Sequence, residues 1–553
     1  MRGDAPGGAA AAVGPGGREA WALAALAAVG VALHLWYALG ADALDTDRAL
    51  VLLMARDFAA GRPTLYFWQQ NYMAALEPLV LAPLAWTGWA TPVAAGVVGV
   101  ALTALLALVS VGLAARLGAP RWVALLFWAL PPAVVAHHHV ALYGARLAAT
   151  LLALTAFAWG LRRPSPRGWV GVGVLVGVAY FADHLMLPWA LGVMWVAVAA
   201  GGLGRLAAGA LPVVAADTVA AVLTPAAHLS GPNDPGSWLG NVPLLFGRTL
   251  PQLFGVLPGG GPGPLFEAPA PLVPEGWAWV LFAVPGGVAL GAMAVTLWRR
   301  RAGVFGGGEG DVAAQALLVA CAAALGLFAV VGGGGDRWPV RYLVPLWPAV
   351  SVLAALAVGS WRAGLRPLAL AAVLPALHTQ VTDGTWPRGG DGAPARAEAE
   401  AVARAVAGTG AEAVWADYWD AYRLALLAGD DPPWLPMRII ERRPALLEEA
   451  LGAGPVAYLV RAGDGEVLDL LARAPDEGIA VLGDEPVGRF RLVVTAAAVP
   501  GATLRSPPPP RWWQGLAALA AGMLFVGAMA GTAVLARLRD RRPSSPTACG
   551  GAS

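Results

Sequence analysis

Charged residues are scarce in this sequence. They make up 13% of its 553 residues, whereas 58% are hydrophobic and the mean hydropathy is +0.62. A soluble globular protein carries about 25% charged and about 45–50% apolar residues. The composition therefore excludes an ordinary cytosolic enzyme and a disordered chain, and it predicts a polytopic α-helical membrane protein.

Lysine is absent, so all 37 basic residues are arginines. This excludes a Schiff-base lysine and a Walker-type phosphate loop, which requires its Lys. The two cysteines, Cys321 in an apolar run and Cys549 near the C-terminus, provide neither a disulfide framework nor a CxxC metal site. A net charge of +2 is too small to indicate binding to nucleic acid.

Twelve apolar runs are predicted as membrane spans, since a span needs roughly 20 apolar residues. A Gly/Ala-rich tail, residues 1–19, precedes the first run and would be cytoplasmic. No clear cleavage site follows that run, which favours a retained span over a signal peptide. The main membrane domain would cover residues 20–380. The runs are 20–38, 93–115, 121–136, 146–161, 168–182, 185–201, 206–224, 277–298, 313–331, 341–359, 366–380 and 513–536.

Arginine gathers in alternate loops between these runs. With the N-terminus inside, every inner loop and the cytoplasmic tail 537–553 satisfy the positive-inside tendency. The run 73–90 is also apolar, and counting it as a span would move the later arginine clusters outside. We therefore interpret it as a helix that lies at the outer surface or dips into it. The inner arginines are Arg116, Arg121, Arg162, Arg163, Arg167, Arg205, Arg299, Arg300, Arg301, Arg362, Arg366, Arg537, Arg539, Arg541 and Arg542.

Polar sequence then falls outside, in loops 39–92 and 225–276 and in segment 381–505. Residues 391–500 hold 18 of the chain's 35 acidic residues, a shift in composition that marks a small extracytoplasmic domain. Helix and strand patterns alternate within it, which predicts an α/β layer. The stiff stretch SPPPP then leads into the last span, and together they cover residues 506–536.

Two carboxylates follow the first span. Asp45 and Asp47 stand at the membrane boundary, where an ionised side chain beside hydrocarbon is costly and therefore tends to have a function. A carboxylate there could act as general base toward an acceptor hydroxyl or amine near the bilayer surface. Alternatively, both aspartates only cap the amphipathic helix that follows. Spacing alone leaves the two interpretations open.

A stretch rich in aromatic and amide side chains comes later in the same loop. Aromatic faces beside amides suit a sugar ring, and they equally suit the aromatic belt of a membrane interface. Tyr72 and Glu77 are the candidates for contact with a substrate. The stretch holds Tyr66, Phe67, Trp68, Gln69, Gln70, Asn71, Tyr72 and Glu77.

The next predicted outer loop, 137–145, begins with three histidines. Adjacent histidines cannot all point one way from a helix, and zinc sites usually show wider spacing, so a polar helix end is favoured over a metal site. His139 and Tyr143 are candidates for contact with a substrate. Arg146 could pair with a phosphate, because its planar fork matches phosphate oxygens. Snorkelling toward the interface is the alternative.

Further polar groups interrupt the apolar runs. Asp183 and His184 are ionisable residues within an apolar run, where charge is costly, so a function is indicated for them. Alternatively, they simply form the turn between two spans. Arg248 in the large outer loop, and Arg341 beside Tyr342, place positive charge outside, against the inside preference. These two arginines are candidates for binding a lipid-linked phosphate.

Several stretches resemble the GT-C superfamily of membrane glycosyltransferases, most closely the family-39-like, protein-mannosyltransferase-type proteins of bacteria. The first outer loop carries the resemblance in DTDRALVLLMARDFAAGRP and LYFWQQNYMAALEPLVLAPL. The stretches VAYFADHLMLPW, WPVRYLVPLWPAVSVLAAL and WADYWDAYRLALLAGD extend it to about residue 495. Each motif is loose, and their shared order and sidedness carry the resemblance.

The resemblance implies an inverting glycosyltransferase. It would move a sugar from a polyprenyl-phosphate carrier to a glycan, lipid or protein acceptor of the envelope, on the outer face of the cell membrane. Asp47 matches the catalytic base of such enzymes, and Asp45 is a spare carboxylate. Arg48 stands where relatives carry a second acidic residue, so a divalent metal ion stays open as a cofactor but is not firmly implied.

The resemblance also suggests roles for other residues. Glu77 matches an acidic position that faces the cavity in relatives, and Arg341 with Tyr342 matches a motif suited to the carrier phosphate. The second outer loop often supplies an acidic residue, which this chain lacks there. The residues that would serve in its place are His139, Tyr143 and Arg146. In the soluble domain, four residues could cap the cavity, hold the acceptor or form a plain packed core: Tyr418, Trp419, Tyr422 and Arg423.

Two other functions stay open at this point. A transporter or flippase of lipid-linked sugars would explain many spans, but it predicts inverted repeats and charges near the bilayer midplane, which the sequence does not show. A catalytically inactive relative that serves in envelope assembly is kept open by Arg48. The sequence specifies neither the sugar, the acceptor, the carrier length nor the oligomeric state.

Overall fold

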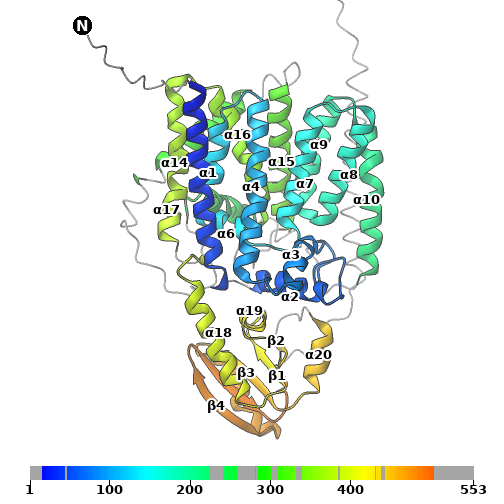
Figure 1. The fold of residues 1–553 in the computed structure, drawn as a ribbon, viewed down its shortest axis with the longest axis vertical. Coiled ribbons are helices and arrows are strands. Elements are labelled where there is room, and N and C mark those ends of the chain that lie inside the picture. The colour runs from blue at the N-terminus through cyan, green and yellow to red at the C-terminus, as the bar shows by residue number, and fades with distance from the viewer. Residues whose placement is uncertain are drawn as a thin grey trace, which may run out of the picture.

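A computed structural model of the chain describes residues 15–43, 46–224, 241–257, 280–281, 284–300, 309–331, 339–383, 386–429, 431–437 and 443–502. This described part is a bundle of apolar helices with a small sheet-containing domain at one end (Figure 1).

The described part of the bundle is built mainly of α-helices, with a few short 3₁₀ and π turns. Its elements are α1 (Pro15–Leu39), η1 (Ala41–Ala43), α2 (Thr46–Ala59), α3 (Leu76–Trp86), α4 (Pro92–Arg116), α5 (Arg121–Ala129), α6 (Ala133–Val140), α7 (Arg146–Leu161), α8 (Pro166–Ala182), η2 (His184–Met186), α9 (Leu187–Ala199), α10 (Leu203–Leu223), η3 (Leu245–Thr249), α12 (Leu250–Leu253), α14 (Val284–Arg300), α15 (Glu309–Val331), η6 (Pro339–Tyr342), η7 (Val344–Leu346), α16 (Trp347–Gly359), η8 (Ala363–Val373) and α17 (Leu374–Thr382).

The small domain follows α17 in the chain. Its elements are α18 (Gly392–Ala407), β1 (Ala413–Ala416), α19 (Tyr418–Ala428), β2 (Trp434–Pro436), α20 (Pro444–Leu451), β3 (Val456–Arg461), α21 (Gly465–Ala472), η9 (Ala474–Glu477), β4 (Val481–Val487) and β5 (Phe490–Thr495).

Five helices of the described residues are long and apolar enough to cross a membrane, or six if the bent pair α5 and α6 counts as one span. The polytopic membrane fold is therefore confirmed. Twelve spans stay a prediction, because α7, α8 and α9 are shorter than the roughly 20 residues of a full span and the run 513–536 lies outside the described residues. The five are Glu19–Leu39, Pro92–Arg116, Leu203–Leu223, Glu309–Ala329 and Val340–Gly359.

Glycines let helices of the bundle approach closely. A Cβ atom added to Gly173 on α8 would lie 2.1 Å from the carbonyl oxygen of Leu206 on α10. One added to Gly209 on α10 would lie 2.1 Å from the carbonyl oxygen of Val170 on α8. Larger side chains at either position would separate the two backbones, and close approach through small residues is a common way for helices to associate in lipid.

A sharp bend interrupts the predicted third span. α5 ends at Ala129, α6 begins at Ala133, and the two helices are bent by 85°. Pro131 and Pro132 occupy the break. Proline lacks an amide proton and disfavours the helical conformation in the residue before it, so these two residues account for the interruption of the helix. The histidines therefore lie on helix α6, and the prediction that a loop begins at residue 137 was wrong.

Helices α2 and α3 lie at the end of the bundle that faces the small domain (Figure 1). With 11 residues, α3 is about 16 Å long and cannot cross a hydrocarbon core of about 30 Å. The structure thus agrees with the interpretation of the run 73–90 as a surface helix. Because η1 leads almost directly from the first span into α2, the start of α2 sits at the membrane boundary.

The small domain contains a five-stranded mixed sheet in the order β2-β1-β3-β5-β4. β1 pairs in parallel with β2 and β3, and β5 pairs antiparallel with β3 and β4. The predicted α/β layer is confirmed. β2 covers Trp434–Pro436, and its register with β1 joins Val414 to Trp434 and Ala416 to Pro436.

Polar contacts join the small domain to the membrane boundary. Arg56 on α2 donates from Nη2 to the carbonyl oxygen of Leu426 on α19, at 3.3 Å. Arg396 on α18 donates from Nε to Oδ2 of Asp42 in η1, at 2.9 Å. α19 also packs along α2. The position of α19 is therefore set by the same helix that begins at the end of the first span.

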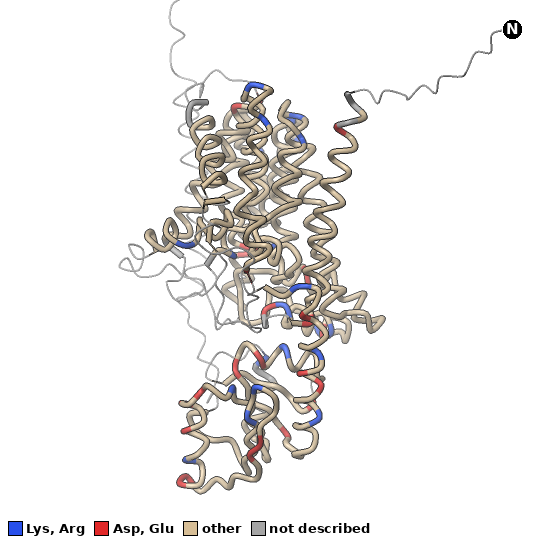
Figure 2. The backbone as a smooth tube through the Cα atoms, turned by 90° about the vertical axis from the view of Figure 1, so that its left-hand side faces the viewer, with Lys and Arg blue, Asp and Glu red and all other residues tan. Residues whose placement is uncertain are grey.

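Charged residues gather at the two ends of the bundle and in the small domain (Figure 2). At the end far from the small domain, Arg116 pairs with Glu309 and Arg121 pairs with Glu19. The location of the small domain outside the membrane stays a prediction, which rests on the arginine-rich inner loops of the sequence.

Accessibility of introduced cysteines tests this orientation. In a chain whose Cys321 and Cys549 are replaced by alanine, Glu477→Cys in the small domain and Arg162→Cys at the opposite end are both exposed sites. We expect an impermeant maleimide to label the cysteine at 477 on intact cells, and the cysteine at 162 only after permeabilisation. The reverse pattern would overturn the predicted orientation.

Candidate active site

A cleft opens at the membrane boundary, between the bundle and the small domain. Its volume is about 210 Å³. This is below the roughly 300–1,000 Å³ of sites for drug-sized ligands, so the cleft suits a compact group such as a phosphate or one sugar ring. Its lining residues are Asp47, Phe67, Gln70, Tyr72, Met73, Tyr143, Arg146, Arg341, Tyr342, Tyr418 and Trp419.

Asp47 lies in the first turn of α2, where the helix dipole favours a carboxylate. Its Oδ2 accepts a hydrogen bond from Nη1 of Arg341 at 3.0 Å, and the two side chains are 17% and 20% exposed. This exposure leaves the ion pair within reach of a ligand that enters the cleft. The predicted base and a predicted phosphate-binding residue thus come together, although 294 positions separate them in the chain.

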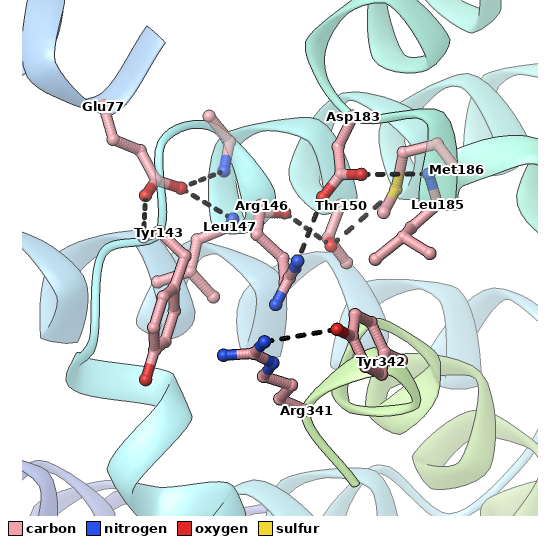
Figure 3. Close-up of polar contacts among 11 residues, drawn as sticks. Glu77, Tyr143, Arg146, Leu147, Thr150, Asp183, Leu185, Met186, Arg341 and Tyr342 are labelled. Atoms are coloured by element: carbon pink, nitrogen blue, oxygen red, sulfur yellow. Dashed lines mark hydrogen bonds and ion pairs between the residues drawn. The ribbon is translucent and has the colours of Figure 1, made fainter. Parts of the chain in front are cut away.

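The 3₁₀ turn η6 positions Arg341. Nη2 of Arg341 donates to the hydroxyl of Tyr342 at 3.2 Å, and its guanidinium carbon lies 5.1 Å from the centre of that ring (Figure 3). A guanidinium over an aromatic face gains cation–π attraction. The Tyr342 ring therefore helps to hold Arg341 at the wall of the cleft.

A second arginine enters the cleft from the start of α7. Nε of Arg146 donates to Oδ2 of Asp183 at 3.3 Å, and its guanidinium lies 5.7 Å from the Tyr143 ring and 5.9 Å from the Tyr342 ring. Asp183 is fully buried and also accepts from the amide of Leu185 at 2.9 Å (Figure 3). Asp183 therefore orients Arg146 and caps the turn η2, and it does not itself line the cleft.

Glu77 caps helix α7. Its carboxylate accepts from the amides of Tyr143 and Leu147, both at 2.7 Å, and from that of Ala148 at 3.4 Å (Figure 3). Burial raises the pKa of Glu77 to about 7, and the backbone hydrogen bonds act in the opposite direction. Because its oxygens are turned to helix amides and it does not line the cleft, we revise its proposed role from substrate contact to positioning of Tyr143 and Arg146.

The three histidines of α6 face different surroundings. Arg48 donates from Nη2 to the carbonyl oxygen of His137 at 3.0 Å, at the end of α6 where the helix dipole favours a cation. Nδ1 of His139 lies 3.0 Å from Nε2 of His34 on α1. His138 and His139 border a small recess next to the cleft, which shares Tyr143 and Arg146 with it. His139 therefore does not line the cleft itself, and its contact with a substrate stays a prediction.

His184 belongs to a separate cluster. Its Nε2 lies 2.9 Å from Oδ2 of Asp217 on α10, and the hydroxyl of Tyr66 donates to Oδ1 of the same carboxylate at 2.8 Å. Burial, followed by the Asp217 carboxylate, raises the pKa of Tyr66. These contacts fasten the loop after α2 to α10.

Two other candidates from the sequence are not found at the cleft. Arg248 is exposed on η3 and does not line the cleft, and Asp45 lies outside the described residues.

The described residues near the cleft do not fit a divalent metal ion. Within the described ranges, no three His, Cys, Asp or Glu side chains come together that could hold one. Arg48 occupies the position next to Asp47 and turns toward the carbonyl end of α6. Asp47 itself contacts a guanidinium.

Some lining residues were not singled out individually from the sequence. Phe67, Gln70 and Met73 belong to the aromatic and amide-rich loop. An isolated antiparallel β-bridge between the backbones of Met73 and Asp183 holds this loop against the turn that follows α8. The aromatic composition of the loop was the available signal. Its backbone pairing, which selects the residues that face the cleft, could not be read from composition. Tyr418 and Trp419 reach the cleft from the small domain, as one of the open interpretations suggested.

Together, the apolar bundle, the boundary helices and the small α/β domain define a polytopic membrane protein with the GT-C type of fold. The chain is similar to ArnT from Cupriavidus metallidurans, a protein whose crystal structure was determined with undecaprenyl phosphate bound. The match has a TM-score of 0.51 and 14% identity, and covers 88% of this chain and 99% of that one. The resemblance drawn from the sequence is thus confirmed at the level of fold. No protein-family model and no curated protein matches the sequence.

The buried carboxyl of Glu77 predicts a pH-dependent stability. Its pKa is about 7 in the folded protein and 4.5 ordinarily, so between these values the folded state retains a proton that the unfolded chain has lost. Stability must then fall as pH rises through this window. We expect the melting temperature in detergent to decrease from about pH 5 to about pH 8, and Glu77→Gln to remove part of that decrease. The exposed Glu477→Gln is the control, and an unchanged slope in Glu77→Gln would refute the assignment.

Proposed function

We propose that the protein is an inverting glycosyltransferase that moves a sugar from a polyprenyl-phosphate carrier to an acceptor of the cell envelope, outside the membrane. The observation that carries this proposal is the contact of Asp47 with Arg341 in a cleft at the membrane boundary, beside Arg146. The fold shared with ArnT supports it, because that protein was solved with undecaprenyl phosphate.

The charges of the cleft suit the phosphate of such a carrier. Two arginines and one aspartate line it, so the described charged lining has one positive charge in excess. Guanidinium groups match phosphate oxygens and would stabilise the negative charge that develops as the leaving phosphate departs. The chain has no lysine, so these arginines carry the role that a lysine could otherwise share.

Asp47 is the proposed general base. In the transfer step the acceptor oxygen or nitrogen attacks the anomeric carbon, its proton passes to Asp47, and the bond from that carbon to the phosphate oxygen breaks with its electron pair going to the phosphate. A single displacement needs the base and the leaving group on opposite faces of the sugar. Arg341 must therefore release the Asp47 carboxylate and bind the carrier phosphate before transfer. After this exchange the carboxylate can accept the proton of the acceptor.

The location of the cleft explains how a lipid-linked donor would reach it. α2 begins directly after the first span, and η6 lies at the start of the apolar stretch Val340–Gly359. A polyprenyl tail can thus stay in hydrocarbon while its phosphate lies in the cleft. The acceptor arrives from the aqueous side, beside the small domain.

Neutralising the base tests the function. We expect Asp47→Asn to lower the rate of sugar transfer from radiolabelled polyprenyl-phosphate sugars to envelope acceptors by about 10²–10⁴-fold, the range for loss of a general base. Asp57→Asn, on the same helix but in an ion pair with the exposed Arg62, is the matched control and should transfer normally.

Expression level and melting temperature must stay the same in both variants for the comparison to hold. Full transfer by Asp47→Asn would remove Asp47 as the base. Failure of the unmodified protein to use any polyprenyl-phosphate sugar would contradict the proposed function itself.

A further inference from the structure

The small domain supplies part of the wall of the cleft. Tyr418 and Trp419, the first two residues of α19, line it together with Asp47 and Arg341 of the membrane domain. Residues more than 350 positions apart in the chain therefore share one small cavity. The proposed chemistry does not use these two aromatic side chains, which leaves their role to be explained.

The two rings are held in a defined geometry. They meet edge to face, with centroids 5.3 Å apart and planes at 89°, and Tyr418 also packs edge to face on Tyr422 at 5.7 Å. Asp417 caps the helix by accepting from the amide of Trp419 at 2.9 Å. Tyr418 is 6% exposed, whereas Trp419 is more exposed, so Trp419 is the outer member of the pair.

A buried ionic network fixes the helix that carries them. Asp420 is fully buried and accepts from Nε of Arg461 on β3 at 2.8 Å. Arg423 of the same helix and Arg489 lie 3.5 and 3.6 Å from its other oxygen. Since one face of α19 is held by this network and another packs along α2, the aromatic pair is preorganised against the helix that carries Asp47.

The topology of the sheet makes this edge a natural binding position. β1 leads through α19 to β2 on one side, and the chain then returns to β3 on the other side of β1. The carboxyl ends of β1 and β3 therefore lie at the point where the strand order reverses, and ligands of open α/β sheets bind at such points. Tyr418 and Trp419 follow the carboxyl end of β1 directly.

The lining of the cleft combines cationic and aromatic side chains. Arg146 and Arg341 supply the cations, and Trp419 and Tyr418 extend the aromatic wall that Tyr72 begins. An anion is attracted to the guanidinium groups. The apolar face of a sugar ring instead packs on an aromatic plane, because its C–H groups lose contact with water there. A donor that joins a phosphate to a sugar has both features.

We propose that Trp419, supported by Tyr418, is the stacking platform for the sugar ring of the donor, so that the small domain determines which sugar is transferred. This inference rests on the proposed function and adds to it the residue that recognises the sugar. Trp419 acts by contact with the ring, whereas Asp420 and its arginines act through Trp419 as positioning residues.

A comparison of two carriers tests the platform. The affinity of the purified full-length protein is measured for undecaprenyl phosphate, and for undecaprenyl phosphate bearing mannose, glucose or arabinose. We expect Trp419→Ala to weaken binding of the sugar-bearing carrier that the unmodified protein prefers by about tenfold, and to leave undecaprenyl phosphate unchanged. Trp419→Phe should recover part of the loss. Trp89→Ala, at a tryptophan 72% exposed on the bundle, is the matched control.

The outcomes separate the two levels of the account. Equal losses for both carriers, or no loss for either, would overturn the platform while leaving the proposed function in place. Failure of the unmodified protein to bind either carrier would instead contradict the proposed function. Melting temperatures of all variants show whether a loss comes from unfolding.

Discussion

The contact between Asp47 and Arg341 is the interaction on which the account of the cleft depends. It joins the start of the boundary helix α2 to the turn η6, and its two groups are neither fully solvated nor fully buried. An ion pair in this situation is held by modest energy, since partial exposure weakens the attraction and partial burial costs solvation. A phosphate can therefore replace the carboxylate as the partner of Arg341. Binding of the donor and release of the base would then be one event.

The rest of the site is arranged around this ion pair by contacts that lie behind the lining of the cleft. Glu77 holds the start of α7, and Asp183 holds Arg146, from positions away from the cleft lining. The loop after α2 is fastened to α10 through Asp217. These buried polar groups have their partners within the protein, and they keep Arg146, Tyr143 and Tyr72 at the wall. A fixed wall around one exchangeable ion pair is an arrangement suited to electrostatic stabilisation without reorganisation.

The sequence predicted the fold class and several lining residues, but not the division between lining and supporting groups. Apolar runs and the acidic segment reveal a membrane bundle and a separate α/β domain because they reflect the solvent each part meets. The cost of charge near lipid singled out Asp47, and it equally singled out Asp183. Arg146, Arg341 and Glu77 were found instead from the type of their charge, their neighbours in the sequence and the family resemblance. The cost of charge near lipid is the same for a carboxylate that caps a helix and for one that faces a ligand, so only the three-dimensional contacts separate them. The break at Pro131 and Pro132 likewise decided where the histidines of α6 lie.

A double-mutant cycle on carrier affinity tests the exchange of partners most directly. Binding of undecaprenyl phosphate is measured for the unmodified protein, Asp47→Asn, Arg341→Gln and the double variant. We expect tighter binding in Asp47→Asn, weaker binding in Arg341→Gln, and a double variant that binds like Arg341→Gln. Asp47→Asn can tighten binding only when the Arg341 guanidinium is present to be released. Additive effects of the two substitutions, or weaker binding in Asp47→Asn, would contradict the exchange of partners.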